Sequence, residues 1–232
     1  TAAVLYYKTQ YRINNDFYDA LYDAVFNDLS DPRGGDYLLY TMEYYMITPG
    51  FKYEDGDMVY GLTFEMGYYT TAEQEAEADV KFAELAEEFT AQYDDEYSLA
   101  RGIYTYICRN VTYDYATLED DEYKLKYTGY AALIDGTAVC QGYANMFYRL
   151  ARECGLNARI VSGTSHGEPH AWNIVKMEGD YYHVDVTWGD GSNTDPAQHR
   201  EEPSFAYFGL SDQEILQARS IDPIPPVPAC RS

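Results

Sequence analysis

The chain has 232 residues, of which 46% are hydrophobic and 16% aromatic, so it can bury a substantial core as one large or two small domains. Its 39 acidic residues outnumber its 16 lysines and arginines, and the resulting net charge of -23 would repel phosphate backbones and anionic membrane surfaces. This balance argues against nucleic acid as a partner. It favours an acidic surface that keeps the protein soluble, with attraction of basic peptides or amines as the alternative.

Targeting and metal signals are also informative. No run of about 18 apolar residues occurs, so no membrane insertion is expected. The chain begins Thr-Ala-Ala without a basic and then apolar leader, and we expect an extracellular or cell-surface bacterial protein whose signal segment lies outside this sequence. The four cysteines fit neither a disulfide framework nor paired zinc sites, and the acidic pairs lack calcium-loop spacing, so no metal and no cofactor is expected.

The first part of the chain predicts a helix followed by a β-hairpin. Apolar residues recur at helical spacing over residues 14–28, where Asn14 or Asn15 is the candidate N-cap. Residues 37–47 and 58–69 are rich in the aromatic and β-branched residues typical of strands. The proline and glycines between them predict the turn of the hairpin.

Two helices and an exposed connection are predicted next. Thr70 or Thr71 resembles a helix N-terminus, and an apolar stripe continues from it to about residue 93. A second helix is predicted over residues 97–110, followed by the extended sequence VTYDY. The charged residues 120–126 predict an exposed connection.

The end of the chain predicts three short elements. Residues 204–210 have the composition of a strand, and Ser211 with an acidic residue three positions later predicts the start of a helix over residues 211–219. Four prolines within residues 221–229 predict an extended, polyproline-like tail.

The segment DGTAVCQGYANMFYRLARECGL places Cys140 directly before apolar residues at helical spacing, near a helix N-terminus. There the macrodipole and the unpaired amide groups favour a thiolate and can stabilise a developing oxyanion. A lone cysteine in such a place is more often a small buried hydrophobe, so the catalytic interpretation needs partners elsewhere in the chain.

The segment HAWNIVKMEGDYYHVDVTW supplies those partners on a predicted hairpin. A two-residue turn at residues 178–179 pairs Met177 with Asp180. In this register His170 and Asp185 are diagonal neighbours on one face, within reach of each other's side chains. His170 then suits a general base and acid, and Asp185 suits the group that orients its imidazole.

The same register carries the returning strand on to Thr187, opposite His170, and turns Val184 and Val186 to a buried face. His183 shares the face of His170, where a strand histidine with a satisfied hydrogen bond is a commoner role than catalysis. Trp172 and Trp188 are either packed aromatics or walls that exclude water from the site.

Three blocks in this order, VCQGYA, HAWN and VDVTW, resemble the motifs of the transglutaminase-like superfamily, and weaker similarity extends the resemblance to residues 97–190. It implies that Cys140 is the nucleophile, His170 the base and Asp185 the third member of a triad. The Cys140 amide is the natural first oxyanion donor, and Tyr130 is a second donor by resemblance or else a packed core aromatic. The remaining candidates for oxyanion stabilisation or substrate binding are Gln141, Trp172 and Trp188.

The fold implied is α+β: a papain-like transglutaminase core, with the nucleophile helix packed on an antiparallel sheet, and an N-terminal helix and β-hairpin extension. We expect an extension over residues 1–95, a catalytic core over 96–220 and a proline-rich tail over 221–232. The expected function is thiol-dependent acyl transfer on peptide or isopeptide amides, with hydrolysis favoured. The alternatives are transamidation of protein glutamine and a non-catalytic cell-surface binding module. A protein or peptide substrate is the expected partner, and nothing in the sequence indicates the oligomeric state.

Overall fold

The computed structural model describes residues 2–8, 14–191, 203–223 and 226–231. The chain divides into two compact units, Thr1–Tyr69 and Thr70–Ser232. The boundary lies before α3 (Ala72–Gln92) and not near residue 95 as the sequence predicted, because α3 packs against α4 (Glu96–Asn110) and α5 (Cys140–Glu153) of the second unit.

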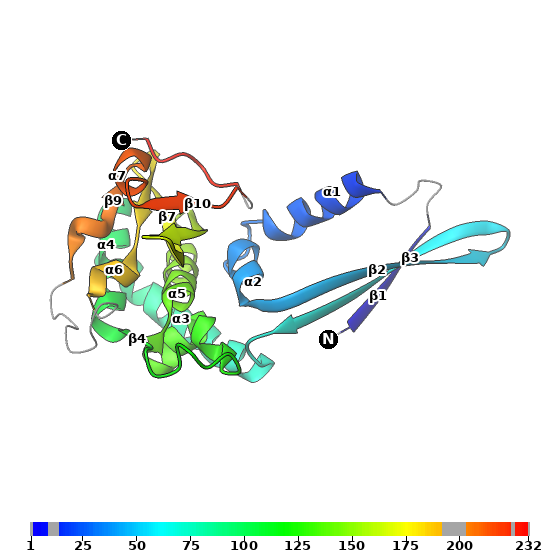
Figure 1. Cartoon of the computed structure of the whole chain (residues 1–232), viewed down its shortest axis with the longest axis horizontal. Helices are drawn as coiled ribbons and strands as arrows, with labels where there is room; N and C mark the ends of the chain where they lie inside the picture. Colours follow the sequence, from blue (N-terminus) through cyan, green and yellow to red (C-terminus); the bar gives the residue numbers. More distant parts are fainter. Residues whose placement is uncertain (1, 9–13, 192–202, 224–225, 232) are drawn as a thin grey trace. The chain divides into compact units, whose positions relative to one another are not determined.

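The first unit is a three-stranded antiparallel sheet with two helices (Figure 1), and the ring of Phe26 in α1 lies 5.7 Å from that of Tyr45 in β2. Its elements are β1 (Ala2–Lys8), α1 (Asn15–Phe26), α2 (Gly35–Thr41), β2 (Met42–Glu54) and β3 (Asp57–Tyr68). The predicted first helix is confirmed, and Asn14 caps it by accepting the Phe17 backbone N–H at 3.2 Å. The hairpin is also confirmed, whereas β1 was not predicted.

Two details of the first unit differ from the sequence prediction. Residues 37–41 form the end of α2 instead of a strand, and the Thr41 hydroxyl donates to the Tyr37 carbonyl within that helix at 2.6 Å. The hairpin turn is only Asp55-Gly56, both with positive φ, because an Asp-Gly pair adopts that conformation at little cost. Pro49 lies inside β2, which tolerates it as an edge strand.

The second unit combines helices with a five-stranded antiparallel sheet in the order β10-β6-β7-β8-β9. The sheet is formed by β6 (Ala158–Ser165), β7 (Glu168–Met177), β8 (Asp180–Val184), β9 (Phe208–Leu210) and β10 (Arg219–Ile221). Around it lie α3, α4, α5, α6 (Val186–Asp190), α7 (Asp212–Ile215), the parallel pair β4 (Thr112–Tyr113) and β5 (Thr137–Ala138), and the short helical turns η1 (Lys124–Tyr127), η2 (Ala131–Asp135) and η4 (Phe205–Tyr207). This mixed fold confirms the predicted α+β class.

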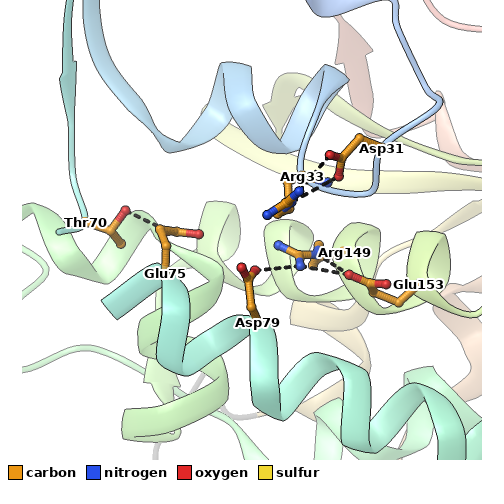
Figure 2. A network of polar contacts seen from close by, with 7 residues as sticks. All are labelled: Asp31, Arg33, Thr70, Glu75, Asp79, Arg149 and Glu153. Carbon is orange, nitrogen blue, oxygen red and sulfur yellow. Dashed lines mark hydrogen bonds and ion pairs between the residues drawn. The ribbon is translucent and has the colours of Figure 1, made fainter. Parts of the chain in front are cut away.

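Helix α5 is the centre of this unit, because it packs against β7 as well as against α3 and α4. The Asn173 side chain of β7 donates to the Ala144 carbonyl of α5 at 3.0 Å. On the α3 side, Arg149 of α5 is almost fully buried, and its guanidinium lies 2.8 Å from both Asp79 of α3 and Glu153 (Figure 2). The helix that begins with Cys140 is therefore fixed to both neighbouring layers.

A second cluster covers the other face of the sheet. It contains Trp172 and Ile174 of β7 together with Ile215 and Cys230, and Val227 of the C-terminal tail packs against it. Figure 1 shows this tail running beside β10 and α7. The predicted proline-rich tail is thus partly a cover for the sheet, while Pro225 lies outside the described residues.

The predicted register of the β7–β8 hairpin is confirmed, since Met177 pairs with Asp180 and Asn173 with Val184. The returning strand is shorter than predicted. It ends at Val184, and Val186 and Thr187 belong to α6, so Thr187 does not pair with His170. The strand stops there because Asp185 is the N-cap of α6 and accepts the backbone N–H of Trp188 at 3.2 Å.

The later elements are also shorter than predicted. Ser211 and Glu214 form a capping box, but the helix that they begin ends at Ile215. The strand predicted over residues 204–210 is a helical turn followed by β9. Among the described residues, no helix has the length and apolar character needed to cross a bilayer.

The connection over residues 120–126 ends in a buried lysine, contrary to the exposure predicted for it. Lys126 has no exposed surface. Its ammonium group donates to the carbonyl oxygens of Thr117, Leu118 and Asp120 at 2.6, 3.0 and 2.8 Å. All three N–H donors of the ammonium group are thus satisfied, and the Lys126 side chain holds the loop that precedes η1 in place.

We predict that Lys126→Met lowers the free energy of unfolding by about 2–4 kcal/mol, because it leaves three loop carbonyls without their buried donor. Chemical denaturation followed by circular dichroism measures the change. Lys124→Met, two residues earlier on η1 and only half-buried, is the control and should leave stability nearly unchanged. Equal stability of the two variants would contradict this role for Lys126.

Candidate active site

Cys140 is the first residue of α5, and it is half-buried. The chain reaches it through β5, which pairs with β4 so that Tyr113 lies opposite Ala138. The Val139 backbone N–H donates to the Lys126 carbonyl at 3.1 Å, which fixes the residue just before the helix. The thiol therefore lies at a helix N-terminus, where the macrodipole favours a negative charge.

His170 and Asp185 meet at the end of the hairpin. His170 belongs to β7 and Asp185 directly follows β8, and His170 Nε2 lies 2.8 Å from Asp185 Oδ2. Asp185 has no exposed surface, and its other oxygen caps α6 through the Trp188 N–H. Because Nε2 is bound to the carboxylate, Nδ1 is the ring nitrogen left to face Cys140.

The charges of the site reinforce one another. Burial opposes the charged form of His170, but the charge and hydrogen bond of Asp185, followed by a hydrogen bond with Cys140, raise the pKa of His170 to about 10. Burial would raise the pKa of Asp185, yet the charge and hydrogen bond of His170, followed by the charge of Arg219, hold that pKa below its usual value. An imidazolium paired with an ionised carboxylate is the state that supports a neighbouring thiolate.

The other three cysteines lie in different surroundings. Burial is the main cause that raises the pKa of Cys108 well above its usual value, and it raises the pKa of Cys154 and of Cys230 to about 12. All three are buried or half-buried. They have the surroundings of structural thiols.

His183 and Trp172 form a structural chain beside the site. The Trp172 indole N–H donates to His183 Nδ1 at 2.9 Å, so Nε2 must hold the proton that binds Asp212 Oδ1 at 2.8 Å. His183, Asp212 and Cys230 lie close enough to share a metal ion. A metal on Nε2 would require the proton to move to Nδ1, where the indole donor already points, so this cluster does not fit a metal. His183 is therefore a strand histidine with satisfied hydrogen bonds, as the sequence predicted.

The tryptophans named from the sequence lie close to the triad. The rings of His170 and Trp172 stack with their centres 5.8 Å apart, and Trp172 is almost completely buried. Trp188 is half-buried and contacts the rings of His166 and Tyr207. Trp172 thus packs directly on His170, whereas Trp188 packs on two neighbouring rings.

Of the remaining candidates, Gln141 follows Cys140 and is half-buried in the first turn of α5. Tyr130 is directed elsewhere, because its hydroxyl donates to Glu77 of α3 at 2.8 Å. A phenol has one proton, so in this arrangement Tyr130 has none left for an oxyanion.

Two side chains that the sequence analysis did not single out reach the site. The Tyr113 phenol is hydrogen-bonded to the Cys140 backbone N–H, and its ring stacks on Tyr143 of α5 with centres 6.4 Å apart. Burial, and then the charge of Cys140, raise the pKa of Tyr113. Arg219 of β10 donates to Asp185 Oδ2 at 2.6 Å. Tyr113 belongs to the VTYDY segment before the nucleophile, whereas nothing local marks Arg219.

Comparison with known proteins finds relatives of the segment that holds Cys140, His170 and Asp185. Residues 83–186 match the model of the transglutaminase-like superfamily. The kyphoscoliosis peptidase of Homo sapiens is 31% identical over an alignment of 121 residues, and the match covers 47% of this chain and 18% of that protein. The protein of the same name from Mus musculus is 32% identical over 121 residues, with the same two shares of 47% and 18%. The chain thus spans only a small part of the length of these relatives.

Two solved structures are also similar to parts of this chain. A crystal structure of a TGase is 18% identical, and the match covers 81% of this chain and 51% of that chain with a TM-score of 0.44. The periplasmic domain of TgpA from Pseudomonas aeruginosa is 12% identical, with 62% and 58% covered and a TM-score of 0.38. The matched segment runs from within α3 to the residue after Asp185, so this part of the chain is similar to a transglutaminase-like domain.

Proposed function

We propose that this chain is a thiol-dependent hydrolase that cleaves peptide or isopeptide amides in protein or peptide substrates, through a thioester on Cys140. The observation that carries the proposal is the 2.8 Å hydrogen bond between His170 Nε2 and Asp185 Oδ2, beside a cysteine in the first turn of α5. A nucleophile, a base that contacts it and a group that orients the base are the parts that acyl transfer requires.

In the acylation step the Cys140 thiolate attacks the amide carbonyl carbon, and the carbonyl oxygen becomes an oxyanion. The imidazolium of His170 then gives its Nδ1 proton to the departing amine as the carbon–nitrogen bond breaks. The thioester remains on Cys140, and His170 is neutral. Asp185 stays ionised throughout, since its role is to hold the imidazole and stabilise its positive form.

In the deacylation step neutral His170 takes a proton from water, and the resulting hydroxide attacks the thioester carbonyl. The carbon–sulfur bond breaks, the carboxylic acid product leaves, and the thiolate–imidazolium pair is restored. A primary amine in place of water would yield a transamidation product by the same steps. Water is the default acceptor at its molar concentration, which is why hydrolysis is the activity that we propose.

Two donors suit the oxyanion of both steps. The Cys140 backbone N–H is the first, and it currently contacts the Tyr113 phenol. A substrate oxygen that enters between them would accept both the N–H and the phenol O–H. Tyr113 therefore replaces Tyr130 as the proposed second donor, because the Tyr130 proton is bound to Glu77.

We predict that limited iodoacetamide labels Cys140 before the other thiols, because burial holds Cys108, Cys154 and Cys230 in the neutral form. Peptide mass mapping after partial labelling measures the order. Labelling in denaturant is the control, and there all four cysteines should react alike. Preferential labelling of Cys108 or Cys154 in the folded protein would remove Cys140 as the nucleophile.

We predict that Cys140→Ala and His170→Ala reduce turnover to background, because one lacks the acylated atom and the other lacks the acid for the leaving amine. Asp185→Asn should retain slight activity, reduced about 100-fold or more, since the amide keeps a hydrogen bond without the charge. A peptide-library digest with and without a primary amine, analysed by mass spectrometry, measures turnover and separates hydrolysis from transamidation. Parent-like turnover by the alanine variants would overturn the thioester mechanism, whereas no turnover by the parent itself would favour the binding-module alternative.

We predict that Tyr113→Phe lowers kcat by about 100-fold, the usual cost of one oxyanion donor. It should also weaken inhibition by a peptide aldehyde, whose thiol adduct bears an oxyanion, while the rate of iodoacetamide labelling stays the same. Tyr115→Phe is the matched control, as its ring lies 5.0 Å from that of Tyr113. A rise in kcat in Tyr113→Phe would instead mean that the phenol blocks the site.

A further inference from the structure

Arg219 lies outside the segment that matches the superfamily model, yet it is bound to the triad. It is the first residue of β10, the edge strand that pairs with β6 and places Arg219 opposite Ser165. Its side chain is only 5% exposed, and Nη2 donates to Asp185 Oδ2 at 2.6 Å. Arg219 thus contacts the buried Asp185 carboxylate although the two residues are 34 positions apart in the sequence.

The oxygen that Arg219 binds is the one that His170 binds. Asp185 Oδ2 lies 2.8 Å from His170 Nε2 and 2.6 Å from Arg219 Nη2, while Oδ1 accepts the Trp188 N–H. In a fully buried site, two cationic donors thus share one negative charge. Each cation therefore weakens the electrostatic stabilisation that the carboxylate gives to the other cation.

Aromatic rings hold the guanidinium in this position. Its central carbon lies 5.8 Å from the ring centre of Trp172, 5.9 Å from that of Trp188 and 5.6 Å from that of Tyr207. A planar guanidinium suits such stacking, and its fixed fork makes it a better orienting donor than a flexible ammonium. Both tryptophans that flank the dyad therefore also contact Arg219.

We propose that Arg219 is a positioning residue of the catalytic site, which fixes the Asp185 carboxylate and competes with the His170 imidazolium for its charge. The inference rests on the proposed thiol mechanism. A carboxylate with His170 as its only cationic partner would stabilise the imidazolium too strongly, and the imidazolium would then be a poorer acid toward the leaving amine. Arg219 limits that stabilisation while it keeps Asp185 ionised.

Other titratable groups surround these three side chains, and each contributes to the local potential. Cys140 faces His170, and His183 of β8 lies near Arg219. Tyr104 and Cys108 of α4 lie near both Asp185 and Asp190, and the His166 ring contacts Trp188. Among the described residues, His170 and Arg219 are the cationic side chains that contact the Asp185 carboxylate directly. Removal of Arg219 should therefore act first on His170.

The test is a titration of His170 by NMR in histidine-labelled protein with Cys140→Ala, which removes the contribution of the thiol. Addition of Arg219→Gln should raise the pKa of His170 by about one unit, a tenfold change in proton affinity, because the competing cation is gone. Arg231→Gln, an exposed arginine of the tail, is the control and should leave the titration unchanged. An unchanged or lowered pKa in Arg219→Gln would overturn the proposal, since a merely structural role moves stability and not this value.

Arg219→Lys separates charge from geometry, and it also serves if Arg219→Gln does not fold. Lysine keeps the positive charge, so the pKa of His170 should stay close to that of the parent, while the loss of the rigid fork should lower kcat by about tenfold in the Cys140 enzyme. Parent-like kcat in Arg219→Lys would overturn the positioning role. The titration needs no turnover, so a protein without hydrolytic activity would contradict the proposed function and still allow this measurement.

Discussion

The second unit is organised around a carboxylate that has no contact with water. An isolated charge in a protein interior is strongly unfavourable, and Asp185 is tolerated because donors from three different elements converge on it. They are the His170 ring of β7, the first turn of α6 and the guanidinium of β10. Each donor is placed by secondary structure. The buried Asp185 carboxylate therefore stays ionised only if the sheet has this strand order and α6 begins at this position.

The two faces of the five-stranded sheet are covered by different elements. One face carries α5, whose first residue is Cys140 and whose later turns are tied to α3 through Arg149. The other face is covered by α7 and the C-terminal tail, which enclose Trp172 and link it through His183 to Asp212. Cys140 and His170 thus belong to elements of a unit whose sheet is packed on both faces, which limits their independent movement.

The sequence predicted the parts of this site that depend on local pattern. Turn chemistry at residues 178–179 set the hairpin register, and apolar spacing after Cys140 set the start of α5, because both signals act over a few residues. The prediction of a strand through Thr187 failed because alternation of apolar residues does not reveal that Asp185 caps a helix. Residues 37–41 likewise have strand-like composition, but tertiary packing makes them helical.

Side chains that act over long sequence distances were beyond such reasoning. The exposed connection ending in Lys126 was inferred from charge, yet that charge is satisfied by carbonyls of its own loop. Tyr130 was chosen by resemblance, and only the packing of α3 reveals Glu77 as its partner. No periodicity, turn signal or motif in the sequence predicts the contact of Arg219 with Asp185.

The position of Arg219, 34 residues after Asp185, also has a consequence for how the site assembles. During synthesis, Cys140, His170 and Asp185 emerge from the ribosome before β10 exists, and a chain at that stage must bury the carboxylate with one cation fewer. The β7–β8 hairpin and α5 are synthesised first, but Arg219 reaches Asp185 only when β10 pairs with β6. The contact between Arg219 and Asp185 can therefore form only after β10 has been synthesised, and loss of β10 would change the surroundings of Asp185 without altering Cys140, His170 or Asp185 themselves.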